Sequence, residues 1–290
     1  MIYHYTKAIT HLALEDYQAL VHTALVEDCP NHDVTSEAIF SSGEQCRARL
    51  VTREDGVLAG QDIVTEIERQ NPDRFSFEFL KKDGEVFTAG SCLAVFEGQL
   101  NTLLRVERVL LNFLQYISGI ASETNRLVQS YPGLTILDTR KTLPAYRKIA
   151  KYAVYCGGGS NHRINLSDMA MIKDNHVAMF GSIPKAVGAI REKFPKQKVE
   201  LEIDSLQQLD AAILAAPDIL LLDNFTLADT QSAIAQLRQK APNIFIECSG
   251  GITPEKLQAL SKLGEGIGVS MGYLTHTTRF LDLSLDIERL

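Results

Sequence analysis

The chain has 290 residues, 45% of them hydrophobic and 22% charged, and 29 Lys and Arg against 36 Asp and Glu give a net charge of −7. This composition is that of a globular enzyme with one large or two moderate domains. It argues against a membrane span, because no apolar run reaches the roughly 18 residues required, and the acidic balance argues against nucleic-acid binding. Five scattered cysteines without a C-x-x-C pair indicate reduced thiols, a cytoplasmic location and no structural zinc.

The first hundred residues predict an α+β module. Residues 14–28 carry apolar side chains at helical spacing. Residues 46–60 and 75–98 contain short β-rich runs broken by Asp55-Gly56 and Asp83-Gly84, which are turn signals. We therefore expect an antiparallel sheet in this module.

A long amphipathic helix is predicted over about 101–117, since its apolar residues recur every three or four positions. Ser118-Gly119 predicts an interruption, after which a second helix extends to about residue 130. Residues 275–290 come after the last predicted strand, and we expect them to return to the N-terminal module.

From residue 133 onward, short apolar runs alternate with predicted helices. Successive runs end about twenty to thirty-five residues apart, which is the scale of a βα unit, and each ends in polar residues. The six runs are 134–138, 168–172, 199–202, 218–222, 243–247 and 266–269. Because a full α/β barrel has eight strands, the pattern predicts an incomplete barrel or an open parallel sheet. In either fold the strand C-termini surround the active site.

Cations follow the early strands. Arg140 and Lys141 would bind a carboxylate and a phosphate side by side, although a solvated loop explains them equally well. His162 and Arg163 come shortly after three consecutive glycines, which allow close approach of the backbone to a ligand. Lys173 ends the second run, where Schiff-base formation, anion binding and ion pairing are the alternatives.

Carboxylates and glycines follow the later strands. Glu202 and Asp223 would bind Mg²⁺ or ribose hydroxyls, or would instead pair with nearby cations. Ser249–Gly251 and Ser270–Gly272 follow the last two strands, where barrels often bind phosphate through backbone N–H groups. Together these residues predict a barrel enzyme for a phosphorylated, multiply anionic substrate, but they do not name the reaction.

The order and length of several motifs resemble the quinolinate phosphoribosyltransferase family nearly end to end. These motifs are Asp33-Val-Thr-Ser36, Ser118-Gly-Ile-Ala-Ser122, Asp138-Thr-Arg-Lys-Thr142, Lys151-Tyr-Ala-Val154, Gly157-Gly-Gly-Ser-Asn-His-Arg163, Ile172-Lys-Asp-Asn-His176, Leu222-Asp-Asn-Phe225 and Glu247-Cys-Ser-Gly-Gly-Ile252. Ser122 and Asn165 depart from the family pattern, and we expect them to alter loop geometry without changing the reaction.

The resemblance implies that quinolinate and phosphoribosyl pyrophosphate react to nicotinate mononucleotide, pyrophosphate and CO₂, a step of NAD synthesis. It implies an N-terminal α/β sandwich, residues 1–112 with 275–290, and a C-terminal incomplete α/β, TIM-like barrel, residues 113–274. It also implies Mg²⁺ as cofactor and a homodimer or larger homo-oligomer whose subunits share active sites.

The resemblance further implies roles for individual residues. The substrate-binding positions are Arg108, Thr139, Arg140, His162, Arg163, Lys173, Ser249, Gly250, Gly251, Ser270, Met271 and Gly272. The catalytic positions are Arg140, Lys141, Lys173, Glu202 and Asp223. Lys141 would meet the pyrophosphate, Glu202 and Asp223 would hold Mg²⁺, possibly through water, and Arg108 would reach the site of the partner subunit.

Three alternatives stand beside this interpretation. A molybdenum-transport-associated paralogue of the same family is disfavoured by Lys173–His176, a segment that it lacks. A nicotinate phosphoribosyltransferase binds a monocarboxylate and needs fewer cations than Arg140, Arg163 and Lys173 supply together. A non-catalytic ligand-binding barrel is disfavoured because Glu202 and Asp223 are both present.

Overall fold

The chain folds into two compact units in this computed structural model, which describes residues 7–290. We call one the sandwich unit, residues 9–126, 143–158 and 274–290, and the other the barrel unit, residues 7–8, 127–142 and 159–273. Residues 275–290 thus return to the N-terminal module, as expected from the sequence. None of the helices found in residues 7–290 combines the length and the apolar character needed to cross a membrane.

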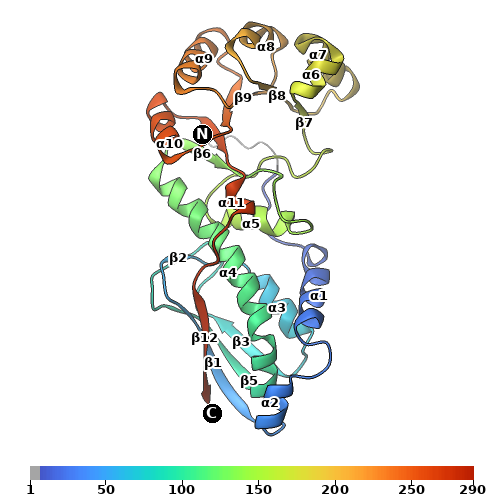
Figure 1. Ribbon diagram of the computed structural model, residues 1–290, viewed down its shortest axis with the longest axis vertical. Coiled ribbons are helices and arrows are strands. Elements are labelled where there is room, and N and C mark those ends of the chain that lie inside the picture. The colour runs from blue at the N-terminus through green and yellow to red at the C-terminus, as the bar shows by residue number, and fades with distance from the viewer. Residues whose placement is uncertain (1–6) are drawn as a thin grey trace. The chain divides into compact units, whose positions relative to one another are not determined.

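The sandwich unit is built on an antiparallel sheet, as predicted. Its strands lie in the order β12 (Leu283–Arg289), β1 (Gln45–Thr52), β5 (Cys92–Gln99) and β3 (Phe75–Phe79), so the C-terminal strand lies beside β1 (Figure 1). Along β1 buried Cys46, Ala48 and Leu50 alternate with exposed Arg47 and Arg49. One face of this sheet therefore packs on the core and the other faces water.

Four shorter helices, the long helix α4 and two short strands complete the sandwich unit. They are a 3₁₀ turn at Leu14–Asp16, α1 (Gln18–Asp28), α2 (Val34–Ile39), the paired strands β2 (Gly56–Val57) and β4 (Val86–Phe87), α3 (Gln61–Arg69), α4 (Leu100–Ser130, as far as residue 126) and α5 (Arg147–Cys156). The apolar sides of α3, α4 and α5 and the buried face of the sheet form one core cluster.

The long helix is not interrupted, and the prediction of a break at Ser118-Gly119 is wrong: α4 continues through both residues. A Cβ atom on Gly119 would lie 2.2 Å from the carbonyl oxygen of Arg279. The Ser118 hydroxyl donates to the carbonyl of Ala59 and accepts its N–H. Both residues thus make contacts with segments that are distant in the chain. The sequence shows only the Ser-Gly pair, which predicts a helix break.

The boundary between the units also differs from the one expected at residues 112 and 113. Residues 113–126 and α5 belong to the sandwich unit. The physical reason is burial, because Ile117 on α4 and Ile149 on α5 are fully buried in the same core cluster as Leu50 of the sheet.

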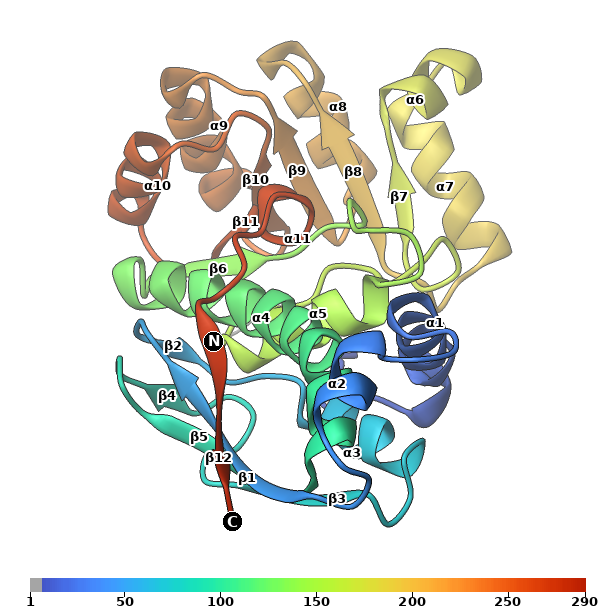
Figure 2. The same ribbon diagram turned by 60° about the horizontal axis from the view of Figure 1, so that its bottom comes forward.

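The barrel unit contains six parallel strands, and all six predicted strands are confirmed. They are β6 (Leu134–Leu137), β7 (Ala170–Ile172), β8 (Val199–Ile203), β9 (Ile219–Asp223), β10 (Phe245–Ser249) and β11 (Ile267–Ser270). Their order in the sheet is β6-β11-β10-β9-β8-β7 (Figure 2). Because β6 and β7 lie at opposite edges of the sheet, the barrel is incomplete, which confirms the predicted fold class.

Helices connect these strands. They are α6 (Asp174–Phe180), α7 (Ile183–Lys193), α8 (Leu209–Ala215), α9 (Leu227–Lys240), α10 (Pro254–Leu260) and α11 (Tyr273–His276), with 3₁₀ turns at Leu206–Gln208 and Ser261–Leu263. α7 and α8 pack against β8. Since side chains alternate across a strand, the buried apolar Val199, Leu201 and Ile203 occupy one face of β8 and Glu200 and Glu202 the other. The acidic face is the one that β8 turns toward the site.

Candidate active site

A loop from the end of α5 brings His162 and Arg163 to the free edge of β6. Ser160 extends the sheet there, because its N–H donates to β6 at 2.8 Å and its backbone forms a parallel bridge. The fully buried Asp138 accepts the His162 N–H at 2.9 Å and the Asn161 side chain at 2.7 Å. The backbone of this loop is therefore fixed by a carboxylate at the end of β6.

Arg140 and Arg163 lie close enough to repel each other. The pKa of the Arg163 guanidinium is lowered, mainly by burial and next by the charge of Arg140. The charges of Glu200 and Asp168 act in the opposite direction and raise it. Arg163 is only 6% exposed and donates through Nη1 to the Met169 carbonyl at 3.1 Å. Within residues 7–290 the buried Nε groups of both arginines have no hydrogen-bond partner. Two unsatisfied cationic donors at one place favour an anionic ligand.

Lys173 and Glu202 form an ion pair between neighbouring strand ends. The Lys173 ammonium donates to Glu202 at 2.5 Å, and the Glu202 side chain is only 13% exposed. The Lys173 N–H donates to Nδ1 of His176 at 2.9 Å, which fixes the start of α6. The ion-pair alternative for these two residues is thus present, and it holds both charged groups at the C-terminal edge of the sheet.

The turns after β9 and β10 are hydrogen-bonded and packed against each other. The Asp223 carboxylate accepts a hydrogen bond from the Asn224 side chain at 2.8 Å, and the Asn224 N–H donates to the Ser249 carbonyl at 3.0 Å. Gly250 has a left-handed φ of 75°, and a Cβ there would lie 2.1 Å from the Asn224 side chain, so only glycine fits. Lys256 donates to the Gly250 carbonyl at 3.0 Å, which adds a cation that sequence reasoning did not select.

The turn after β11 is hydrogen-bonded to the neighbouring strand β6. The Met271 N–H donates to the Leu137 carbonyl at 3.1 Å, and Ser270 and Met271 are buried. The two glycine turns predicted to bind phosphate do follow adjacent strands, β10 and β11. The Met271 N–H, however, is already donated within the protein and is not available to a phosphate oxygen.

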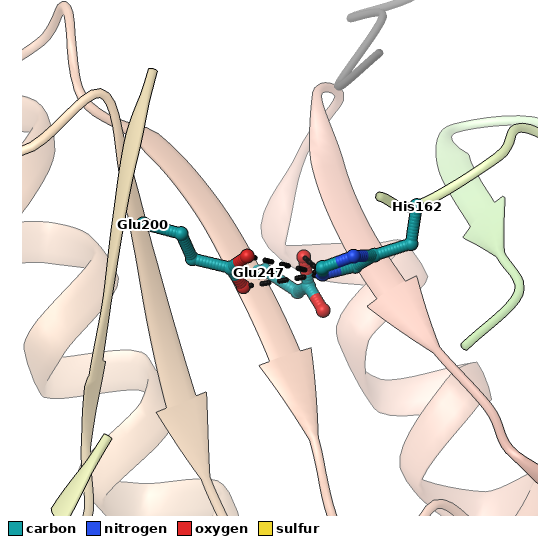
Figure 3. A group of neighbouring side chains, drawn as sticks. All are labelled: His162, Glu200 and Glu247. Atoms are coloured by element: carbon teal, nitrogen blue, oxygen red, sulfur yellow. Dashed lines mark hydrogen bonds and ion pairs between the residues drawn. The ribbon is translucent and has the colours of Figure 1, made fainter. Parts of the chain in front are cut away.

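Two buried carboxyl groups inside the barrel were missed from the sequence. Glu200 on β8 and Glu247 on β10 are fully buried and converge on the His162 ring (Figure 3). The Nε2 atom of His162 lies 3.1 Å from Glu200 and 3.7 Å from Glu247. The signal available in the sequence was the spacing of two, since Glu200 and Glu202 must face the same side of one strand.

Some predicted features lie elsewhere. Arg108 is exposed on α4 in the sandwich unit. The approach of a ligand to Gly157 and Gly158 stays a prediction, and both glycines have a structural role: a Cβ on Gly157 would lie 2.3 Å from the Ala121 carbonyl, and Gly158, with φ of 83°, follows α5. These two glycines pack α5 against α4 and end it.

Comparisons with known proteins agree with the family resemblance. The model of the quinolinate phosphoribosyl transferase N-terminal domain matches residues 33–118, and the model of the C-terminal domain matches residues 120–286. Together the two models span most of the chain.

Individual relatives align over nearly their whole length. The chain is 40% identical to the nicotinate-nucleotide pyrophosphorylase [carboxylating] of Mycobacterium leprae, over 88% of this chain and 91% of the relative. It is 39% identical to a probable enzyme of the same name from Bacillus subtilis, over 96% and 95% of the two chains. The solved structure of nicotinate-nucleotide pyrophosphorylase from Francisella tularensis superposes with a TM-score of 0.92 at 35% identity, covering 98% of this chain and 100% of that one.

Proposed function

Since this chain belongs to the quinolinate phosphoribosyltransferase family, we propose that it transfers the phosphoribosyl group of phosphoribosyl pyrophosphate to quinolinate with loss of CO₂. The products are nicotinate mononucleotide, pyrophosphate and CO₂. As a member of this family the chain is a pentosyltransferase, and its proposed place is in NAD synthesis in the cytoplasm.

The observation that carries the proposal is the pair of arginines, Arg140 and Arg163, whose Nε atoms are buried. Quinolinate is a dicarboxylate, and Arg140 and Arg163 each keep a buried Nε donor without a partner among residues 7–290. Their mutual repulsion is relieved when a dianion lies between them. A monocarboxylate such as nicotinate would neutralise only one of these charges, so the arrangement favours a dicarboxylate.

The phosphoribosyl donor is assigned to the opposite side of the sheet's C-terminal edge. We assign its 5′-phosphate to the turns at Ser249–Gly251 and Ser270–Gly272, with the exception of the Met271 N–H. Lys141 is exposed, and its backbone N–H donates to the Thr139 hydroxyl at 3.0 Å. We assign its ammonium to the pyrophosphate. This division places the 5′-phosphate of the donor on fixed backbone and its pyrophosphate on a cation.

Glu202 and Asp223 suit the Mg²⁺ that the family implies. They lie on neighbouring strands, and the register pairs Glu202 with Leu221, two residues before Asp223, so both carboxylates face the same side. Carboxylate oxygens are hard ligands, and Mg²⁺ usually keeps waters and substrate phosphates in its shell. When bound, Mg²⁺ would neutralise charge on the pyrophosphate leaving group.

The chemistry then follows from charge placement. As the bond between C1′ and pyrophosphate breaks, the sugar becomes oxocarbenium-like, and the carboxylates of Glu202 and Asp223 stabilise that positive charge. Lys141 stabilises the departing pyrophosphate. The pyridine nitrogen of quinolinate donates its electron pair to C1′. The resulting pyridinium ring accepts the electron pair left when the C2 carboxylate departs as CO₂, and a proton from solvent replaces it.

The test is release of CO₂ from carboxyl-labelled quinolinate, with phosphoribosyl pyrophosphate and Mg²⁺ supplied. We expect CO₂ and nicotinate mononucleotide in equal amounts, and no release when either substrate is omitted. A preparation of the Lys173→Ala variant, purified in the same way, sets an upper limit on the activity of any contaminating enzyme. Release no faster than in that variant, or faster phosphoribosylation of nicotinate than of quinolinate, would contradict the proposal.

We also propose a homodimer or larger homo-oligomer. Exposed apolar side chains precede and follow β7 in the chain, with Leu166 70%, Met179 89% and Phe180 56% exposed. A groove of about 640 Å³ lies there and includes Arg163 in its wall. An exposed apolar surface of this kind marks an interface, and a second copy that covered it would bring its own residues toward Arg163.

Shared sites can be tested by mixing two inactive variants. The Arg108→Ala and Lys173→Ala variants are each expected to be nearly inactive. If Arg108 acts in the partner's site, random exchange of subunits in a dimer restores one intact site per mixed pair, about a quarter of wild-type activity. No recovery after confirmed subunit exchange would show that Arg108 does not act across an interface.

A further inference from the structure

We propose that Glu200 is a positioning residue, which acts through the His162 ring to hold Arg163 in the quinolinate pocket. This inference rests on the function proposed above and names a residue that acts behind the groups contacting substrate. Glu200 is fully buried on β8, and His162 is 6% exposed.

The hydrogen bonds of His162 determine its tautomer. The Arg163 backbone N–H donates to Nδ1 of His162 at 2.7 Å. A backbone N–H is only a donor, so Nδ1 must present its lone pair, and in the neutral ring the proton lies on Nε2. That Nε2–H points at the Glu200 carboxylate, at 3.1 Å from one oxygen and 3.3 Å from the other.

Both ring nitrogens of His162 are therefore engaged inside the protein. The expectation that His162 binds a substrate carboxylate directly gives way to an indirect role, because neither nitrogen is left to face a ligand. A metal ion is also disfavoured, although His162, Glu200 and Glu247 offer ligand atoms within 4.8 Å of one another. A histidine ligates a metal with a ring lone pair, and the only lone pair here is on Nδ1, which is occupied by the Arg163 N–H.

Glu200 thus supports Arg163 in two ways. Mechanically, the contact between Glu200 and Nε2 fixes the orientation of the imidazole ring. Nδ1 of that ring accepts the Arg163 N–H and so fixes the backbone that carries the Arg163 side chain. Electrostatically, the charge of Glu200 favours the charged guanidinium and opposes the effects of burial and of Arg140. A substrate carboxylate then meets an Arg163 already oriented, which lowers the cost of binding.

The test compares two substitutions of Glu200 in the full-length enzyme. Glu200→Leu removes the acceptor at similar volume, and we expect the KM and the calorimetric Kd for quinolinate to rise roughly tenfold or more. Glu200→Gln keeps an oxygen that can accept the Nε2–H, and we expect a smaller rise. In both variants the KM for phosphoribosyl pyrophosphate stays within about twofold of wild type, because the proposed role concerns only one substrate.

Glu247→Gln is the matched control. Glu247 is as buried as Glu200, but its oxygen lies 3.7 Å from Nε2, beyond hydrogen-bonding distance. We expect a smaller change in the KM for quinolinate than in Glu200→Leu. Equal changes in the two variants would overturn the assignment of the hydrogen bond to Glu200.

A double-mutant cycle with His162→Leu separates positioning from simple loss of charge. If Glu200 acts through the ring, Glu200→Leu adds little to His162→Leu. Additive losses, an unchanged KM for quinolinate, or a stoichiometric metal that is lost with Glu200→Leu would each overturn the inference. If Glu200→Leu does not fold, the same cycle is run with Glu200→Gln and His162→Gln. A wild-type enzyme inactive with quinolinate would instead refute the proposed function itself.

Discussion

The two sheets of this protein differ in the polarity of the side chains that they bury. In the sandwich unit the buried face of the antiparallel sheet is apolar, with Ala48, Leu50 and Phe96 fully buried. In the barrel unit the parallel strands turn Glu200 and Glu247 inward and bury both completely. Burying a carboxyl group carries a desolvation cost that its partners must offset, so the charged interior of the barrel depends on pairings such as that of Glu200 with His162. The apolar face supports the fold of the sandwich unit, whereas the charged interior lies in the unit to which we assign the substrates.

The largest expected effect comes from a charge at the barrel's C-terminal edge. Lys173→Ala should lower kcat/KM for quinolinate by about 100-fold, since it removes a pocket cation and leaves Glu202 without its 2.5 Å partner. Steady-state kinetics measure this effect. Circular dichroism should show an unchanged fold, because Lys173 is 43% exposed.

Lys240→Ala is the matched control for Lys173→Ala. Lys240 is 45% exposed and pairs with Asp210 at 3.0 Å, so it resembles Lys173 in type, exposure and pairing but follows no strand of the sheet. Its kcat/KM should stay within about twofold of wild type, because exposed ion pairs contribute little. Similar losses in both variants would mean that the barrel edge is not special, and the contrast between the two sheets would lose its functional meaning.

A second prediction compares two glycines in helices, one in each unit. Gly119→Ala in α4 should lower the free energy of unfolding by about 1–3 kcal/mol, because its Cβ would lie 2.2 Å from the Arg279 carbonyl. Gly188→Ala in α7 meets no atom within 4 Å and should instead raise it by about 1 kcal/mol. Urea unfolding measures both changes. A neutral Gly119→Ala would mean that the C-terminal segment yields, and that the sandwich unit is less tightly packed than its burial indicates.

The strands of the barrel could be predicted because each is a short apolar run with polar residues at its end. The same rule directed attention to Arg140, Lys173, Glu202 and Asp223, which stand at or just beyond strand ends. It also explains the omission of Glu200, which lies within a strand and reads as an interruption of an apolar run. Whether it faces inward depends on the pleat and on the sheet being curved, neither of which a local window shows.

Contacts between distant segments were equally out of reach. Gly119 is read as a helix break because its neighbour in space, Arg279, lies 160 positions away in the chain. The hydrogen bonds of His162 are another case, since the sequence analysis assigned its ring to a ligand. Only the positions of the Arg163 N–H and of Glu200 reveal that both ring nitrogens are already used.

The smallest predicted effect asks whether the two interiors differ at alkaline pH. Burial raises the pKa of the Cys248 thiol in the barrel unit from 9.0 to about 12, and burial likewise raises the pKa of Cys156 in the sandwich unit to about 12. The native protein then keeps these protons above pH 9 while the unfolded chain releases them. The unfolded state therefore binds fewer protons, and stability falls as pH rises from about 9 to 12.

Removing either thiol should flatten this fall. The free energy of unfolding is measured with urea at a series of pH values. Between about pH 9 and 12 it should fall less steeply in Cys248→Ala and in Cys156→Ala than in wild type, and each slope should differ from that of wild type by at most about 1.4 kcal/mol per pH unit. Below pH 8 the slopes of all three proteins should coincide, since the thiol is protonated in both states. Similar flattening in the two variants would mean that burial alone sets the effect. A clearly larger change for Cys248→Ala would show that the charges beside it, where Lys256 lowers the pKa of Cys248 and Glu247 raises it, make the interior of the barrel distinct from an apolar core.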